Sequence, residues 1–408
     1  MLSRPFLVLY LCVFVATMGI SMVSPLLPVY AKDLGANGIW LGLTFSSFAI
    51  VQAIAGPFIG RTSDRFARKP FIVAGLVVYL ISALGYLTAD NFYQVIGFRA
   101  FSGLGTSAIF SVARAYVGDM TPSGREGRWL GVFQTADIVG FGTGPVVAGV
   151  IRQFVGFDAV FVCMASMMAA SAIIVVLLLP PRATGSGGKT GADRPVSVSF
   201  RRAASDRLVV ALTLWAGLTS LSFGATFSFL ALRLEVDIGA SPALIGLAFT
   251  AQDLSGGLLQ PISGVLADRW NRRVMVVLSL GITAFLMVAL GVASSLWIVM
   301  LTLMGMGAVQ TFAFTAGGAM QVVAGRRVGM GTMLGLFSFG NGIGIVTGSL
   351  VGGVMNDLYG TAAAFYFGAV AVAAGAIVFF AMTRGLRVNE DLAPEAGAKS
   401  GEPVVAGR

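Results

Sequence analysis

Two carboxylates, those of Asp137 and Asp253, lie deep inside long apolar stretches of this sequence. A carboxylate held away from water can take up and release a proton near neutral pH, so both residues are candidates for proton chemistry. The alternative is a neutral Asp that hydrogen-bonds a neighbouring helix and serves packing only. Arg99 is also enclosed by apolar residues, where an arginine needs water or a partner unless its side chain snorkels to the surface. We predict that Asp137, Asp253 and Arg99 take part in proton coupling.

Uncharged polar residues and large apolar residues accompany these groups within the apolar stretches. Amide side chains could complete the polar lining of a cavity, although each of them taken singly could also join two helices by a hydrogen bond. Aromatic and thioether groups offer an adaptable surface for varied hydrophobic ligands. The residues that we expect to line such a cavity are Gln52, Gln134, Gln252, Gln310, Asn341, Met22, Phe223 and Phe227.

Other kinds of chemistry lack the residues that they need. The chain has no histidine, and Cys12 and Cys163 lie within apolar runs without neighbouring metal ligands. No pair of nucleophile and base can be recognised, and no G-x-x-x-x-G-K-[ST] stretch for ATP is present. We therefore predict that the protein is not an enzyme and that it holds no metal ion and no cofactor.

Apolar runs of about 20 residues, the length that crosses a bilayer core of about 30 Å, recur along the chain. Composition agrees, because 56% of the residues are apolar and only 11% are charged. Soluble domains carry about a quarter charged residues. We predict an all-α membrane protein with twelve transmembrane helices. They cover residues 5–30, 39–60, 70–88, 93–117, 129–150, 158–180, 207–231, 242–264, 274–292, 296–320, 330–354 and 362–383.

The first run is predicted to be a helix and not a removed signal peptide, because it is long, contains Pro25 and Pro28 and lacks a small-residue cleavage site.

The placement of basic residues predicts the orientation of these helices. If the N-terminus is cytoplasmic, 22 of the 27 basic residues fall on cytoplasmic segments, as the positive-inside rule requires. Both termini are then cytoplasmic, in an inner or plasma membrane. The net charge of +9 therefore reflects topology and contact with anionic lipids, without any need for nucleic acid. The five exceptions are Lys32, Arg152 and Arg233 on outer loops, Arg99, and Arg114, which is interpreted as a snorkelling residue.

An internal repeat divides the chain into two halves. The stretch GRTSDRFARK at 60–69 recurs as GVLADRWNRR at 264–273, which is an offset of 204 residues. The same offset carries Asp137 onto Asn341, so an amide fits the same position in the second half. We predict two six-helix bundles, at 1–180 and 207–384, joined by a cytoplasmic linker at 181–206 and followed by a disordered cytoplasmic tail at 385–408.

The stretch at 60–69 resembles the signature G-x-x-x-D-R-x-x-R-K of the major facilitator superfamily, with Thr62 where Leu is usual and Ala67 where Gly is usual. Arg99-x-x-x-Gly103-x-Gly105 resembles a second motif of that family. The resemblance covers residues 1–384 and implies the major facilitator fold, in which two pseudo-symmetric six-helix bundles enclose a substrate site near the membrane midplane.

The resemblance also implies a conformational latch, by which the charged loop contacts the start of the eleventh helix and holds the outward-open state. Physically, Arg68 can pair with Asp119 at the end of the fourth helix. A purely topogenic cluster of basic residues is the alternative. The predicted latch residues are Gly60, Asp64, Arg65, Arg68, Asp119, Gly264, Asp268, Arg269 and Arg272.

A row of small residues, Gly140-x-x-x-Gly144-Pro145-x-x-x-Gly149, resembles the antiporter signature of the twelve-span drug:proton antiporter group. Small residues four positions apart let helices approach closely, and a proline bends the helix. We expect this row to pack at the interface between the two halves. Helix packing without any role in antiport is the alternative, since membrane helices use this spacing widely.

These resemblances imply a secondary active transporter that exports hydrophobic or cationic small molecules in exchange for protons. Its expected partners are the small-molecule substrate, protons and the lipid bilayer, with no nucleic acid, and we expect a monomer. Two alternatives stay open. One is the uptake of a sugar, an amino acid or an organic acid, and the other is a membrane receptor or scaffold that does not transport.

Overall fold

The computed structural model describes residues 4–121, 126–180, 203 and 205–386. Within these residues every predicted span is a helix and there is no strand, so the prediction of an all-α fold with twelve spanning helices is confirmed. Most of the predicted linker at 181–206 and of the tail at 385–408 lies outside the described residues.

The first half of the chain supplies six spans. The first span breaks at its prolines, because Pro25 and Pro28 lack the N–H that would continue the helix. It therefore consists of α1 and the short α2. The bounds are α1 Arg4–Val23, α2 Leu27–Asp33, α3 Gly38–Arg65, α4 Arg68–Leu87, α5 Phe92–Met120, α6 Glu126–Phe154 and α7 Phe157–Leu178.

The second half repeats this order. Its first span continues into a short π-helical segment, η1. The bounds are α9 Arg207–Leu232, η1 Arg233–Asp237, α10 Pro242–Arg269, α11 Arg272–Val292, α12 Leu296–Val328, α13 Met330–Tyr359 and α14 Thr361–Thr383. Ten of the described spans are long and apolar enough to cross a membrane by composition alone. The two that fall short are α6 and α10, which carry the acids Asp137 and Asp253.

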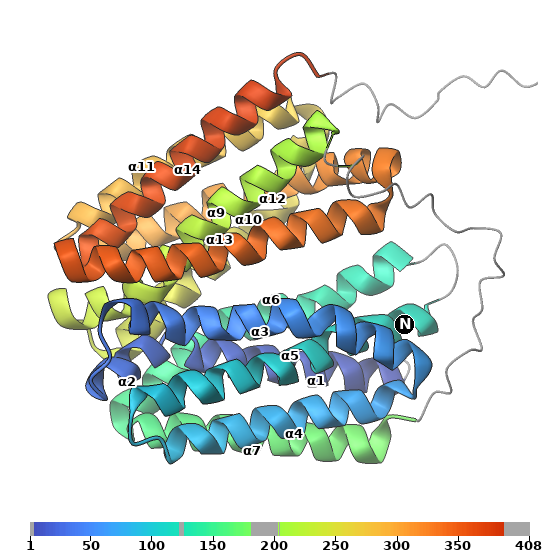
Figure 1. The fold of residues 1–408 in the computed structure, drawn as a ribbon, viewed down its shortest axis with the longest axis vertical. Coiled ribbons are helices and arrows are strands. Elements are labelled where there is room, and N and C mark those ends of the chain that lie inside the picture. Colours follow the sequence, from blue (N-terminus) through green and yellow to red (C-terminus); the bar gives the residue numbers. More distant parts are fainter. Residues whose placement is uncertain (1–3, 122–125, 181–202, 204, 387–408) are drawn as a thin grey trace, which may run out of the picture.

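Each half buries its own apolar core. One cluster lies among α1 to α7, around large side chains such as Tyr79, Tyr116 and Phe161. The other lies among the helices from α9 onward, around Trp215, Phe365 and Phe379, and takes Val29 from the first half. Figure 1 shows the two groups of helices one above the other. We call the end at which α7 ends and α9 begins the linker end, and the end with α2 and η1 the far end.

The halves meet through two symmetric helix pairs, α6 with α10 and α3 with α13. At the far end, Gly149 lies so close to the backbone of Pro242 that a Cβ would not fit, and Gly353 lies equally close to Gly38. The offset of 204 residues carries the first contact onto the second. The repeat seen in the sequence is therefore a two-fold symmetry of the interface, and glycine permits this backbone contact.

A central cavity of about 1370 Å³ is lined by α3 and α5 of the first half and by the helices from α9 to α14 of the second half. Its lining includes Pro57 and Leu334, which lie near the linker-end termini of α3 and α13. The helices of the two halves also diverge toward that end in Figure 1. The molecule is thus closed at the far end and hollow toward the linker end.

Candidate functional site

A side pocket of about 320 Å³ between α6 and α10 brings the two predicted acids together. Asp137 comes from the first half and Asp253 from the second, and both line this space, which we call the acid pocket. Gln252, Gln310 and Phe314 line both the acid pocket and the central cavity. These three side chains stand between the two spaces, so the acid pocket adjoins the central cavity.

Asp137 is held by two partners from its own half. Thr17 on α1 donates a hydrogen bond from Oγ1 to Oδ1 of Asp137 at 2.8 Å. Arg114 on α5 places Nη2 at 3.3 Å from Oδ2, with the arginine side chain 55% exposed and the aspartate side chain 28% exposed. Arg114 also lines the central cavity, so its interpretation as a snorkelling residue is wrong. The two contacts join α6 to α1 and to α5.

Asp253 stands in the same pocket without such support. Its side chain is partly buried, and within the described part of the chain its carboxylate makes no hydrogen bond or ion pair. Asp253 approaches the other half at Gly142, where an added Cβ would lie 3.6 Å from the Cβ of Asp253. An unpaired charge away from water is costly. Asp253 is thus the acid of this pocket whose negative charge no described side chain compensates.

Arg99 lies apart from the acids. It is 1% exposed, lines neither cavity, donates from Nη2 to Ser24 Oγ at 2.7 Å and stacks over the ring of Phe48 at 4.4 Å. The side chain does not snorkel, since it is enclosed within the first half. These contacts tie α5 to the break between α1 and α2.

Most of the predicted lining residues surround the central cavity: Gln52, Gln252, Gln310, Asn341, Phe223 and Phe227. Two do not line it. Met22 is fully buried in the core of the first half, because it sits on the face of α1 that packs against Gly144 of α6. Gln134 is exposed and lines neither cavity. Asn341, the repeat counterpart of Asp137, accepts a hydrogen bond from Ser220 Oγ.

The glycine row on α6 serves two interfaces. An added Cβ would lie 2.6 Å from the carbonyl oxygen of Phe14 at Gly140, and 2.6 Å from that of Met18 at Gly144. Both contacts are with α1 of the same half, so the expectation of an interface between the halves is wrong for these two glycines. It holds for Gly149, which meets Pro242. The carbonyl of Pro145 also packs against Gly246 of α10.

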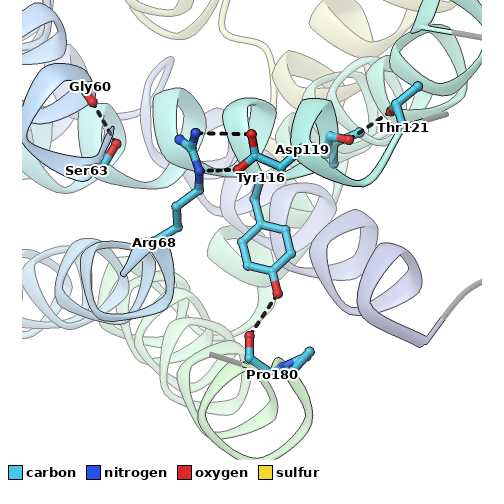
Figure 2. A network of polar contacts seen from close by, with 8 residues as sticks. Gly60, Ser63, Arg68, Tyr116, Asp119, Thr121 and Pro180 are labelled. Atoms are coloured by element: carbon cyan, nitrogen blue, oxygen red, sulfur yellow. Dashed lines mark hydrogen bonds and ion pairs between the residues drawn. The ribbon is translucent and has the colours of Figure 1, made fainter. Parts of the chain in front are cut away.

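The predicted partners Arg68 and Asp119 are joined at the linker end, as Figure 2 shows. Arg68 donates from Nε to Oδ2 at 2.6 Å and from Nη2 to Oδ1 at 3.3 Å. Nearby, Tyr116 donates from its hydroxyl to the carbonyl oxygen of Pro180 at 2.8 Å. All these residues belong to the first half. An added Cβ at Gly60 would meet nothing within 4 Å, so none of the described helices packs closely on Gly60 in this conformation. The side chains of Asp64 and Arg65 lie outside the described residues.

The second copy of the loop is built differently. Arg272 donates from Nε to the carbonyl oxygen of Ala267 at 3.0 Å and lies 3.9 Å from Asp268. The repeat counterpart of Asp119 is Val323, so no carboxylate stands on the fourth helix of this half. Gly264 has open space around it, and Arg269 is exposed. The ion pair between helices is therefore a property of the first half.

An ion pair that sequence reasoning missed joins the halves at the far end. Arg152 on α6 donates two hydrogen bonds to Glu235 on η1, from Nη1 to Oε2 at 2.6 Å and from Nη2 to Oε1 at 2.5 Å. The guanidinium also stacks over the ring of Phe157 at 4.1 Å. The arginine side chain is 9% exposed, which protects this far-end pair from solvent screening. The one available signal was a basic residue on an outer loop, against the positive-inside bias.

Comparison with known proteins agrees with this architecture. The model of the Major Facilitator Superfamily matches residues 9–232 and 212–406. The chain is 25% identical to an uncharacterized MFS-type transporter of Methanocaldococcus jannaschii, over 94% of this chain and 99% of that protein. It is 25% identical to the multidrug resistance protein MdtG of Proteus mirabilis, over 90% of this chain and 91% of that protein.

Two solved structures share the fold at low sequence identity. A bacterial homologue of the human lysosomal transporter Spinster, inward-facing and unoccupied, matches with a TM-score of 0.77 and 16% identity over 93% of this chain and 96% of its own. The nucleoside transporter NupG matches with a TM-score of 0.75 and 14% identity over 92% of this chain and 99% of its own.

Proposed function

Because this chain belongs to the major facilitator superfamily and is a multi-pass membrane transporter, we propose that it exports hydrophobic cations in exchange for protons. One observation carries the proposal. Among the described residues no side chain pairs with the carboxylate of Asp253, which lies in a pocket that adjoins a large cavity with an aromatic lining. Either a proton or an organic cation can neutralise it, and the aromatic side chains of Phe223, Phe227 and Phe314 suit a hydrophobic body.

Competition for one carboxylate gives exchange its mechanism. A proton on Asp253 removes the charge that holds a cation, and a bound cation removes the place for a proton. If each ligand lets the halves change conformation, a proton entering from one side drives a cation out to the other. Asp137, already held by Thr17 and Arg114, would contribute to the charge of the pocket and to its coupling with Asp253.

The conformation supports the same cycle. We place the protein as a monomer in the inner or plasma membrane, with the linker end in the cytoplasm. In that orientation the cavity opens inward and the far-end pair closes the outer side. In this state a substrate enters the cavity from the cytoplasm. The name of the relative MdtG, a multidrug resistance protein, agrees with export. The similar solved structures support the assignment of the fold and give no support to a direction of transport.

Transport by the full-length protein in proteoliposomes tests the proposal. A fluorescent hydrophobic monocation should accumulate in vesicles whose lumen is acidic relative to the bath, because protons leaving the lumen drive the cation inward. The accumulation should collapse when the pH difference is abolished. Empty liposomes and the Asp253→Asn variant provide the controls.

The alternatives give other results in the same vesicles. Uptake of an organic acid with protons, bound through Arg114, would require an acidic bath instead of an acidic lumen. A receptor or scaffold would move none of a panel of cations, sugars, amino acids and organic acids. Either result would contradict export of cations by proton exchange.

A further inference from the structure

Three ionisable side chains set the charge of the substrate site. Among the described residues that line the two cavities, Arg114, Asp137 and Asp253 are the charged ones. With all three ionised, their sum is one negative charge. Arg114 therefore cancels one of the two carboxylates, and a substrate entering the site finds one charge to neutralise.

The position of Arg114 fits this role better than a role in packing. Its side chain is 55% exposed and lines the central cavity. It contacts Asp137 through one nitrogen, with Nη2 at 3.3 Å from Oδ2. Thr17 already satisfies the other oxygen of Asp137. The guanidinium thus stands in the cavity as a cation tethered beside one of the two acids.

We propose that Arg114 determines charge specificity by limiting the substrate to a single positive charge. This inference rests on the proposed export of cations. A monocation pairs with Asp253 and leaves the Arg114–Asp137 pair intact. A second positive charge on the same ligand has no free carboxylate to meet, and near Asp137 it is repelled by the guanidinium. The opposite arrangement, two free acids, would accept a dication.

Two probes of similar size and shape separate these cases. N-methyl phenylpyridinium carries one positive charge and N,N′-dimethyl bipyridinium carries two, on the same two-ring body. The full-length protein should bind and transport the monocation and discriminate against the dication. The Arg114→Gln variant should raise the ratio of dication to monocation, in binding and in transport, by about tenfold or more, because a free carboxylate then faces the second charge.

Two matched variants test whether charge is the cause. Arg114→Lys keeps the positive charge and should keep the low ratio. The double variant Arg114→Gln/Asp137→Asn returns the site to one negative charge, so the ratio should fall back toward that of the unmodified protein. If the double variant keeps the gain, Arg114 acts through its size, and the inference is wrong. An unchanged ratio in Arg114→Gln would overturn it equally.

Binding measured by calorimetry on the purified protein keeps this test separate from the proposed function. If the unmodified protein binds the monocation without moving it against a pH gradient, proton exchange fails, yet the binding ratio still reports on Arg114. If it transports the monocation and Arg114→Gln leaves the ratio unchanged, the function stands and the inference fails. If it binds neither probe, both the cation site and the inference are rejected.

Discussion

Asp137 and Asp253 line the same pocket and both carry a carboxylate, yet among the described residues only Asp137 has hydrogen-bonding partners. An acid that an arginine and a threonine already hold exchanges one partner for another when a ligand arrives. An unpaired acid gains its first partner, which is a larger change in free energy. The surroundings therefore favour Asp253 as the group whose occupancy couples proton and substrate.

This difference predicts unequal effects of two isosteric substitutions. Asp253→Asn should abolish accumulation driven by a pH difference and weaken binding of a monocation by about tenfold or more, because the uncompensated charge is gone. Asp137→Asn should leave Arg114 unpaired in the cavity and weaken monocation binding by repulsion, while some pH-driven transport remains. Transport with and without a pH difference, measured for both variants, distinguishes them. Equal uncoupling by both would mean that the two carboxylates titrate as a pair.

The two acids could be found from sequence because charged residues are rare in apolar runs, and their meeting in one pocket followed from the family resemblance. The pairing of Arg114 with Asp137 could not be found in that way. An arginine near the end of a span has the same sequence signature whether its side chain turns outward to the surface or inward to a cavity. Only the packing of α5 against α6 decides between the two directions.

At the level of helices, the glycines of α6 divide between packing inside one half and contact across the interface. Gly144 faces α1 of its own half, whereas Gly149 faces α10 of the other. The sequence pattern marks all of them as sites of close approach, and this part of the prediction follows from size alone. The choice of neighbour depends on the face of the helix: Gly140 and Gly144 lie four positions apart on the face toward α1, whereas Gly149 lies on the opposite face, toward α10.

Gly144→Leu should therefore impair the fold of the first half. A leucine there overlaps the backbone of α1, and overpacking of this kind costs about 1–3 kcal/mol of stability. Thermal unfolding of the purified variant should occur at a lower temperature, with little change in the position of one half relative to the other. An unchanged unfolding temperature would mean that α1 and α6 can separate freely, against the contact seen here.

Gly149→Leu makes the contrasting case on the same helix. Its side chain would overlap Pro242 across the interface, so closure of the far end should become unfavourable while the fold of each half is retained. Distances between spin labels placed on the far-end loops of the two halves should lengthen. Thermal stability close to that of the unmodified protein is the expected control. Unchanged distances would show that this contact does not limit closure.

For the molecule as a whole, contacts at opposite ends set the balance between its two open states. In this conformation the far end is closed by Arg152 and Glu235, and at the linker end none of the described helices packs closely on Gly60. The latch that the sequence predicts at the linker end would favour the opposite state. The latch role of Asp64 stays a prediction, since its side chain lies outside the described residues.

Loss of the far-end pair should favour the state with an open far end. Arg152→Gln leaves Glu235 without its bidentate partner, which at this partly buried site costs the closed state about 2 kcal/mol. A change of that size shifts a two-state population more than tenfold. Spin-label distances across the far end should lengthen and those across the linker end should shorten. If neither distribution changes, the far-end pair is only an accessory to the glycine contacts.

Asp64→Asn should shift the same equilibrium in the other direction, by weakening the state with a closed linker end. Because the two sites lie at opposite ends of the molecule, their effects should add. The double variant Asp64→Asn/Arg152→Gln should then restore a distribution of spin-label distances near that of the unmodified protein, although each single variant departs from it. Transport should recover in part for the same reason, since exchange requires both states to be populated. If the double variant keeps the distribution of Arg152→Gln alone, Asp64 does not stabilise a closed linker end, and the charged loop serves topology instead.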